Sequence, residues 1–271
     1  LDEPEEVALD RALDAQRARG LHFEVLEPEE ARGREPALSA SLHAAFAFSR
    51  DGVARAGRVG RALALSARSA GVRVHERVRA RGVAIAGGRV AGVETPFGTL
   101  PAEAVVLAER GGSRRFAGAP PLPLASAARP WLKLDASADP DRPARLLFSR
   151  AVALVPRRDG TVLALGRPAP DDGAAALPAA RVAALLADVA RLVPASGTWG
   201  LAGTGSSRER FAPDRRPLLG ETGTPGLFVA AGWGGDELLL APAAAAVLAD
   251  LVTGRTPPLA ASPYAPERSG T

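Results

Sequence analysis

The residues best suited to bind a ligand form a glycine cluster near the end of the chain. An apolar run at 226–231 is followed by Gly232, Gly234 and Gly235, and then by Asp236 ahead of an Ala- and Leu-rich stretch. This order predicts a buried parallel strand that turns tightly into a helix, which Asp236 can cap. Glycine lets a ligand approach the backbone, and a helix N-terminus favours electron-rich ligand atoms. The segment therefore indicates a nucleotide-site geometry, although such junctions also occur in α/β proteins that bind no ligand.

The residue types that most often bind metals or act as nucleophiles are scarce in this chain. It contains no cysteine, which excludes disulfides, a thiol nucleophile and a thiolate metal site. Only His22, His43 and His75 remain as imidazole candidates, and the alternation around His75 makes it a strand residue. We therefore expect structural roles for the three histidines and no metal site.

Composition predicts a globular protein with one large or two ordinary domains. The 271 residues are 46% hydrophobic, which is enough to bury a large core. The most apolar stretch, 238–252, is interrupted by Pro242 and Asp250, so we expect no membrane-spanning segment. The chain opens with acidic residues where a signal peptide would be basic, and a cytoplasmic location is expected.

The charge pattern argues against a nucleic-acid partner. The sequence pI is near 10.6, but the formal net charge is only +4 and Lys133 is the sole lysine among 34 basic residues. The arginines are scattered through every segment, often near acidic residues, and only 4% of the residues are aromatic. The sequence therefore indicates neither a basic patch nor a set of platforms on which bases could stack.

Helices and strands alternate in the elements expected to position the glycine cluster. An amphipathic helix with Leu9 and Leu13 on its apolar face is expected to end at Gly20. The next expected elements are strands at 22–26 and 44–48 and a helix at 56–70 that Gly71 ends.

The most regular β pattern in the chain follows that helix. A strand at 72–77 is expected to precede a hairpin, in which 82–86 and 89–94 flank the turn Gly87-Gly88. The run 104–108 is fully apolar, as in a buried strand. A second β-rich block has strands expected from Trp131 and at 146–148, 152–155 and 161–165, and then a helix at 178–193.

Seven segments together resemble the D-amino-acid-oxidase-like flavoproteins, and the glycine oxidase branch most of all. They are GRVAGVET at 88–95, AVVLA at 104–108, LVPRRDG at 154–160, PD at 213–214, PLLG at 217–220, GLFVAAG at 226–232 and AP at 241–242. The resemblance covers essentially the whole chain in consistent order. It rests on the joint order and spacing of the segments, because no single one of them is specific.

The resemblance implies an α/β fold in which an FAD/NAD(P)-binding-like layered domain is interleaved with a mixed-sheet substrate domain. The substrate domain would comprise 1–54 and 121–209. The FAD domain would comprise 55–120 and 210–271, the latter with the flavin loop and the C-terminal helix. The implied activity is oxidation of a small amine or amino acid by hydride transfer to FAD. Such transfer depends mainly on orientation over the flavin, so no catalytic acid or base is assigned.

The same resemblance implies which residues contact the cofactor. The flavin ring would lie over the loop at 232–238, and the adenine would lie near the backbone of Val78. The cofactor-binding residues expected in this way are Val78, Ala108, Gly232, Gly234, Gly235, Asp236, Glu237 and Leu238.

One departure from the family concerns the dinucleotide-binding unit. Members begin with a strand, a Gly-x-Gly-x-x-Gly turn and a helix that seat the ADP pyrophosphate. This sequence starts at a point that corresponds to the substrate domain. The segment GTGSSR at 203–208 looks superficially similar, but no helix pattern follows it at once, and we reject it as that turn. We therefore expect the FAD-binding domain to be incomplete.

Other departures lie at positions that the family uses near the flavin. Glu109 and Arg110 stand where the family has a small residue and a glycine, and 165–169 keeps neither the family's Thr nor its Glu. In the family, the N-terminal end of this helix stabilises the anionic reduced flavin. Glu237 would place a negative charge at that end and oppose this stabilisation. These changes predict impaired redox chemistry and put FAD binding by this chain alone in question.

The substrate-binding arginine is ambiguous. The family holds the substrate carboxylate with an arginine ahead of a Pro-Asp pair, and counting back from 213–214 that position is Glu209. A shift of one residue would let Arg208 or Arg210 serve, although such a shift in a strand turns the side chain to the other face. Arg208 and Arg210 are therefore the candidate substrate ligands. The alternative is that they are solvated arginines paired with Glu209.

Two functions from different classes stay open. The first is a flavin-dependent amine or amino-acid oxidoreductase seen without its N-terminal segment. The second is a non-catalytic descendant that keeps the fold as a binding or scaffold subunit. This alternative is open because the residues expected to form the core and the turns match the family, whereas several residues near the flavin do not. Without the first strand a sheet edge would be exposed, so we expect either a protein partner that covers this edge or a soluble form of poor stability. The substrate, the oligomeric state, and the choice between truncation and natural loss stay open.

Overall fold

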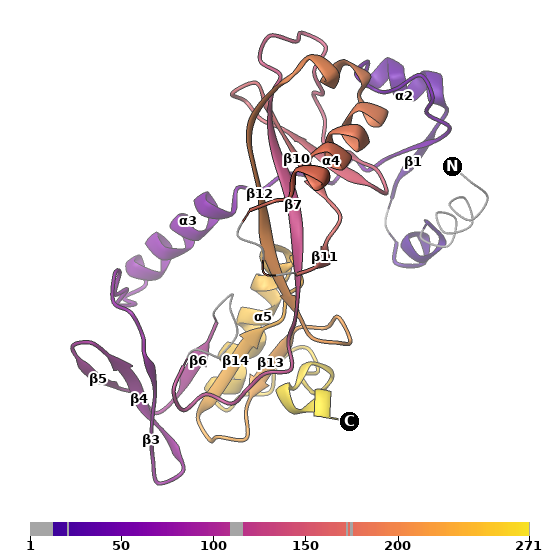
Figure 1. Ribbon diagram of the computed structural model, residues 1–271. Helices are drawn as coiled ribbons and strands as arrows, with labels where there is room; N and C mark the ends of the chain where they lie inside the picture. Colours follow the sequence, from indigo (N-terminus) through magenta and orange to yellow (C-terminus); the bar gives the residue numbers. More distant parts are fainter. Residues whose placement is uncertain (1–12, 21, 109–115, 172, 174–175, 271) are drawn as a thin grey trace. The chain divides into compact units, whose positions relative to one another are not determined.

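The computed structural model describes residues 13–20, 22–108, 116–171, 173 and 176–270 (Figure 1). The chain divides into two compact units, each built from two separate segments. Unit 1 comprises the residues up to Ala54 together with Arg129–Ser207, and unit 2 comprises Arg55–Ala128 together with the residues from Arg208 onward. The sequence predicts divisions after 54, 120 and 209. The roles of the units as substrate and cofactor domains stay predictions.

Unit 1 is built around a six-stranded sheet. Its strands are β7 (Ala125–Asp135), β8 (Leu147–Phe148), β9 (Val152–Pro156), β10 (Thr161–Gly166), β11 (Ala169–Pro170) and β12 (Gly200–Phe211). They are hydrogen-bonded in the order β11-β7-β10-β9-β8, and β12 also pairs with β7. Antiparallel register aligns Ala164 of β10 with Leu132 on one side and with Leu154 on the other. Paired residues share a face of the sheet, so these strands present one continuous apolar surface.

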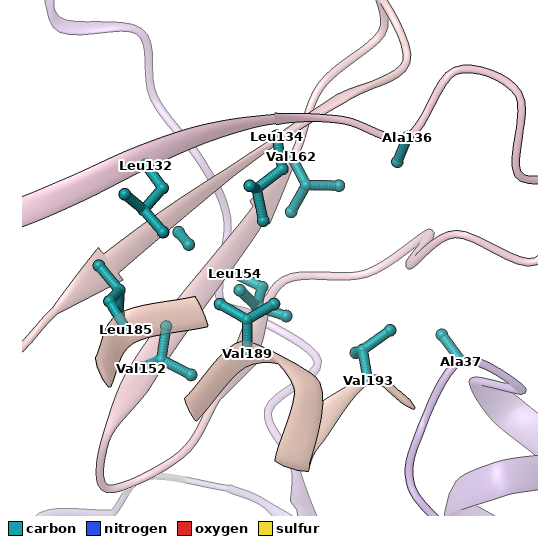
Figure 2. Close-up of a cluster of buried hydrophobic side chains, with 11 residues drawn as sticks. Ala37, Leu132, Leu134, Ala136, Val152, Leu154, Val162, Leu185, Val189 and Val193 are labelled. Carbon is teal, nitrogen blue, oxygen red and sulfur yellow. The ribbon is translucent and has the colours of Figure 1, made fainter. Parts of the chain in front are cut away.

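Helix α4 (Ala179–Leu192) covers the apolar face of this sheet. Figure 2 shows Leu185 and Val189 of α4 directed at Leu132, Leu154 and Val162 of the strands. Four residues separate Leu185 from Val189, which places both on one face of the helix. The predicted helix at 178–193 and the strands of the second β-rich block are therefore confirmed.

A smaller part of unit 1 precedes the sheet. β1 (Glu24–Leu26) pairs antiparallel with β2 (Ala45–Ala47), and α2 (Pro28–Arg34) lies between them in the sequence. The buried carboxylate of Glu35 accepts hydrogen bonds from the backbone N–H groups of Ala144, at 3.1 Å, and Arg145, at 3.0 Å. Residues 13–18 are helical, as predicted, and the rest of the predicted N-terminal helix lies outside the described residues.

Unit 2 contains the sheet that leads into the glycine cluster. Its strands are β6 (Val105–Leu107), β13 (Leu218–Glu221) and β14 (Leu227–Ala231), and α5 (Glu237–Val252) follows β14. The central strand β14 pairs parallel with β6 and antiparallel with β13. All of its residues are buried, so the predicted buried parallel strand is confirmed. Alternate residues enter two clusters: Phe228 packs in the cluster that contains Leu248 of α5, and Val229 in the cluster that contains Ala212.

A second sheet of unit 2 is the predicted hairpin extended by a third strand. Its strands are β3 (Gly82–Ala86), β4 (Arg89–Thr95) and β5 (Gly98–Pro101). Gly87 and Gly88 turn the chain with φ of 56° and 78°, values that favour glycine. Val83 and Val90 bury their side chains in a cluster with Leu227 of β14. Within the described residues, no helix combines the length and the apolar character needed to cross a membrane.

Two elements of unit 2 leave apolar residues uncovered. Helix α3 (Ala56–Ser69) has no buried residue, and its Leu63 and Leu65 are 61% and 62% exposed. Strand β6 lies at the edge of its sheet, and its Val106 is 40% exposed. Among the described strands, β6 pairs only with β14. Both elements therefore present surfaces of the kind that a further polypeptide covers.

The predicted strand at 72–77 is wrong. These residues follow α3 without regular secondary structure, and Val72 and Val74 are exposed. A strand needs a hydrogen-bonded neighbour, and none of the described strands pairs with this segment. Apolar residues do alternate in this segment, but alternation cannot form a strand unless another strand lies beside it.

The Pro213-Asp214 pair has a structural role in unit 2. The guanidinium of Arg268 donates to both carboxylate oxygens of Asp214, from Nε at 3.0 Å and from Nη2 at 3.1 Å. The same guanidinium donates to the backbone oxygens of Arg216 and Ala265. The hydrogen bonds that Asp214 accepts from the Arg268 side chain and from the backbone N–H of Arg216 lower the pKa of Asp214. The charge-assisted pair fastens the end of the chain to the turn between β12 and β13.

Candidate functional site

An open hollow of about 250 Å³ lies beside the N-terminal end of α5, wholly within unit 2. Two segments line it, namely the end of β12 and the loop between β14 and α5. Its residues are Arg208, Glu209, Arg210, Gly232, Trp233, Gly234, Gly235 and Glu237. This volume includes open solvent, and the space that the lining residues enclose is about that of one water molecule.

The loop between β14 and α5 has a backbone that only glycine adopts easily. Gly232, Gly234 and Gly235 have φ of 75°, 61° and 98°. A β-carbon added at Gly232 would stand 2.9 Å from Leu124 Cδ2 and 3.3 Å from the backbone nitrogen of Ala212. The glycines of the loop therefore allow both the tight turn and the close approach of the loop to its neighbours.

The end of β12 holds this loop in place. The N–H of Gly234 donates to the backbone oxygen of Arg210 at 2.8 Å. Phe211 and Trp233 form an antiparallel bridge. The loop is thus attached by backbone hydrogen bonding to the strand that carries the charged residues of the hollow.

Side-chain alternation along β12 separates its three charged residues. Glu209 is buried, at 9% relative exposure, whereas Arg208 is exposed and Arg210 is half-buried. Successive side chains of a strand point to opposite faces, so Glu209 lies on the face opposite to that of both arginines. A β-carbon on Gly235 would stand 3.1 Å from Oε1 of Glu209, so the carboxylate approaches the glycine loop closely.

Six of the predicted site residues line the hollow together. They are Arg208, Arg210, Gly232, Gly234, Gly235 and Glu237. Asp236 and Leu238 adjoin the lining residues in the sequence, whereas the half-buried Val78 and the exposed Ala108 are not among the residues that line it. The cofactor contacts of Val78 and Ala108 stay predictions, and Glu109 and Arg110 lie outside the described residues.

Two lining residues, Glu209 and Trp233, were not predicted as site residues. Glu209 stands at the position expected for the family's arginine, and no ligand contact is predicted for it. Strand alternation in the sequence could have indicated that Glu209 faces inward. Every second residue before it, namely Gly203, Gly205 and Ser207, is small and lies on the same face of the strand. Trp233 lies between glycines, and nothing in that spacing indicates whether its side chain faces a ligand.

The prediction that Asp236 caps α5 is wrong. Asp236 occupies the position before the helix, but its side chain makes no capping hydrogen bond. Its φ of −94° and ψ of 13° differ from the extended conformation that a capping residue usually adopts. Glu237, in the first turn, supplies the acidic residue that the positive end of the helix dipole favours.

The glycines at 203–205 lie inside strand β12 and form no phosphate-binding turn. A β-carbon at Gly205 would stand 2.6 Å from the ring of Trp131 on β7. The glycine therefore makes room for an indole ring, which supports its rejection as a dinucleotide motif. The described residues contain no group of three or more His, Asp or Glu side chains that could hold a metal ion.

Comparison with known proteins identifies the class to which this fold and site belong. The model of the FAD dependent oxidoreductase family matches residues 1–251, and the chain belongs to that family. The crystal structure of glycine oxidase from Geobacillus kaustophilus superimposes with a TM-score of 0.85 at 27% identity. That match covers 98% of this chain and 72% of the other. The glycine-oxidase-like fold implied by the sequence is therefore confirmed.

Two relatives show the range of proteins that this chain resembles in sequence. A D-amino acid dehydrogenase of Cereibacter sphaeroides is 30% identical over 266 residues, which cover 95% of this chain and 61% of the relative. A glycine oxidase of Pseudomonas aeruginosa is 31% identical over 248 residues, which cover 88% of this chain and 66% of the relative. The chain therefore spans about three fifths to two thirds of the length of these two relatives.

The family depends on FAD, and two features of the loop at the hollow bear on whether it suits one end of such a cofactor. Its glycines leave the backbone open where a β-carbon would otherwise stand, and the helix dipole of α5 favours electron-rich atoms. The carboxylates of Glu209 and Glu237 act in the opposite sense, because they disfavour negative charge in the same hollow. The residues thus leave the backbone open to a ligand but disfavour a negatively charged one.

Proposed function

We propose that this chain is part of an FAD-dependent oxidoreductase that oxidises a small amine or amino acid, and that its flavin chemistry is impaired as the chain stands. The glycine loop between the buried strand β14 and helix α5 carries this proposal. In it the three left-handed glycines border an open hollow at the end of a helix. The family membership and the named oxidase and dehydrogenase relatives support the same class of reaction.

The roles of individual residues follow from where they stand. Gly232, Gly234 and Gly235 would hold the edge of the flavin ring against the backbone, and α5 would direct its dipole at that edge. When bound, FAD supplies the acceptor for a hydride from the carbon that bears the substrate nitrogen. Trp233 adds apolar surface that excludes water from the hollow. Glu209 and Glu237 weaken the binding of a negatively charged flavin, which is the basis of the proposed impairment.

Flavin binding is the direct test of this proposal. We expect the protein, after incubation with FAD and removal of the excess, to keep a yellow flavin spectrum that glycine, sarcosine or a D-amino acid bleaches only slowly, because the flavin chemistry is impaired. The Gly235→Ala variant should bind FAD at least several-fold more weakly, because its β-carbon would stand 3.1 Å from Glu209. Gly71→Ala is the matched control. Gly71 also has a positive φ, of 85°, but no atom lies within 4 Å of a β-carbon added there. A protein that stays colourless would end the oxidoreductase proposal for this chain.

The uncovered surfaces of unit 2 favour a second role, the binding of a protein partner. We propose that a polypeptide bearing an apolar strand pairs with the outer edge of β6 and covers α3. An edge strand offers unpaired backbone groups to such a strand, and the exposed leucines of α3 offer it apolar surface. The chain would then act as a scaffold or as one part of a larger enzyme.

Charged substitutions on these surfaces test the partner proposal. We expect the isolated protein to self-associate, and Val106→Lys and Leu63→Glu each to reduce the self-association seen by size-exclusion chromatography with light scattering. Phe97→Lys is the control, since Phe97 is 84% exposed but lies at the tip of the β4–β5 hairpin. A wild-type protein that is monomeric, melts at high temperature and is unchanged by these substitutions would contradict the proposal.

A further inference from the structure

The positive charge of the chain is concentrated in residues 55–81, which form α3 and the segment that follows it. These residues include eight arginines and one acidic residue, Glu76, whereas the whole chain has a formal net charge of only +4. Outside the segment, acidic residues therefore outnumber basic ones. The eight are Arg55, Arg58, Arg61, Arg68, Arg73, Arg77, Arg79 and Arg81. The arginines are thus less evenly scattered than the sequence as a whole suggests.

All eight of these arginines are exposed, and most of them have no acidic neighbour. Arg68 pairs with Glu76, at 2.9 Å between Nη2 and Oε1. In the part of the chain that the structure describes, the other seven side chains form no ion pair or hydrogen bond. The Arg68–Glu76 pair and the hydrogen bond from the N–H of Val72 to Ala67, at 3.0 Å, hold the following segment at the end of α3. Arginine does not lose its charge, so this surface is basic at any physiological pH.

Helix α3 presents a basic face that is distinct from its apolar one. Arg58, Arg61, Leu65 and Arg68 follow one another at intervals of three or four residues, which places them on the same face of the helix. Leu65, in the middle of this face, is 62% exposed. Leu63 lies on the opposite face. A protein partner that covered Leu63 would therefore leave the basic face open.

We propose that the basic face of α3 and the arginines after it bind the surface of a membrane that contains anionic lipids. Guanidinium groups pair with phosphate groups, and each basic residue near an anionic surface adds to the attraction. Leu65 and the apolar stems of the arginines enter the boundary between headgroups and acyl chains. The acidic excess in the rest of the chain is repelled by the same surface, which turns residues 55–81 toward it. This binding requires neither a membrane-spanning helix nor a bound flavin.

A nucleic acid is the other polyanion that a basic segment attracts, and the composition of residues 55–81 favours lipid. The segment contains no aromatic side chain on which a base could stack. It does contain an amphipathic helix with an exposed leucine among its arginines, and a lipid surface accepts such a leucine whereas a phosphate backbone does not. RNA binding is therefore an outcome that the test has to distinguish.

Vesicle flotation in a density gradient tests the proposal with the full chain. The vesicles consist of phosphatidylcholine alone or of phosphatidylcholine with about 30% phosphatidylglycerol. We expect the protein to float with the anionic vesicles at about 0.05 M salt, to be released at about 0.5 M, and not to float with the neutral vesicles. Aggregated protein does not float, so self-association is not mistaken for binding.

A double variant assigns the binding to the basic face. Arg58→Gln combined with Arg61→Gln should weaken binding to the anionic vesicles about tenfold or more, because two charges leave the contact while good helix-forming residues replace them. Arg157→Gln combined with Arg158→Gln is the matched control. These two arginines are also exposed and their loss changes the net charge equally, but they lie in unit 1, between β9 and β10. The control should bind as the wild type does, and circular dichroism shows whether each variant keeps its helices.

Three results would overturn the proposal. The first is equal binding to neutral and anionic vesicles, or to neither. The second is an equal loss of binding in the two double variants, which would mean that only the total charge matters. The third is binding to single-stranded RNA without binding to the anionic vesicles at the same concentration of phosphate groups, which would make the segment a nucleic-acid site. None of these measurements depends on FAD, so their outcome is separate from that of the oxidoreductase proposal.

Discussion

Replacing Gly226 by alanine is expected to destabilise unit 2 by about 2 to 6 kcal/mol and to abolish ligand binding at the glycine loop. Gly226 has a φ of 83°, and an added β-carbon would stand 2.5 Å from the backbone oxygen of Glu103. The left-handed conformation costs about 1 to 3 kcal/mol in a residue other than glycine, and overpacking adds a similar amount. Backbone atoms cannot give way as the end of a flexible side chain does.

The position of Gly226 explains why the damage should reach the site. Its backbone oxygen accepts the N–H of Val105 at 2.8 Å, at the start of the parallel pairing between β6 and β14. A displaced Gly226 disturbs this pairing, and β14 leads directly into Gly232. Native-state hydrogen exchange of the β14 amides measures the loss of stability locally. The same variant should fail to retain FAD.

A control variant at a second glycine separates the cost of backbone strain from the cost of the steric contact with Glu103. Gly254 has a similar φ, of 70°, but nothing lies within 4 Å of an added β-carbon. Gly254→Ala should therefore cost only the conformational term, about 1 to 3 kcal/mol. Equal losses of stability in the two variants would show that the contact with Glu103 has no energetic importance.

The second large effect concerns the core of unit 1, where Leu154→Ala should cost about 2 to 5 kcal/mol. Leu154 is fully buried in strand β9, where it pairs with Ala164 of β10 and Leu147 of β8. Removing its side chain leaves a cavity between the sheet and α4 that neighbouring residues fill only in part. Phe148→Ala is the control, because Phe148 belongs to the same sheet but is 68% exposed. The Phe148→Ala substitution should lower the free energy of unfolding by no more than about 0.5 kcal/mol.

Tryptophan fluorescence allows this measurement to be confined to one unit. Trp131 and Trp199 belong to unit 1 and Trp233 to unit 2. In a Trp233→Phe background, urea unfolding followed by fluorescence reports unit 1 alone, which avoids treating two units as a single transition. A Leu154→Ala midpoint equal to that of Phe148→Ala would contradict the importance of this core.

Local patterns predicted most of the elements correctly, because the forces behind them act over short distances in the sequence. The Gly87-Gly88 turn with apolar alternation on both sides predicted the β3–β4 hairpin. The spacing of Leu185 and Val189 predicted the buried face of α4. The apolar run before Gly232 predicted a buried parallel strand, and β14 is one.

The misses occurred where the outcome depends on a partner distant in sequence. The alternation at 72–77 predicted a strand, but pairing depends on a neighbour that the segment itself cannot specify. Strand β12 contains several glycines and was not bounded in advance, because its glycines make room for Trp131 on another strand. The capping role of Asp236 failed because side-chain direction depends on the loop geometry around it.

The candidate site was predictable in position and less so in its chemistry. The glycine cluster indicated where a ligand would lie, and six predicted residues line the hollow. The sequence left open which of three consecutive charged residues faces the ligand, because a shift of one residue exchanges the two faces of a strand. In the structure all three of these residues line the hollow.

The interleaving of the two units has a consequence for the order of folding during synthesis. Unit 1 needs residues as far as Ser207, and unit 2 needs residues beyond that point. Neither unit can therefore fold completely until most of the chain has left the ribosome. Until then, the segments that are synthesised first keep apolar residues exposed. Contacts between segments so distant in sequence also make folding slow. For the same reason, no single cut of the chain separates one unit from the other, so neither unit can be prepared alone by simple truncation.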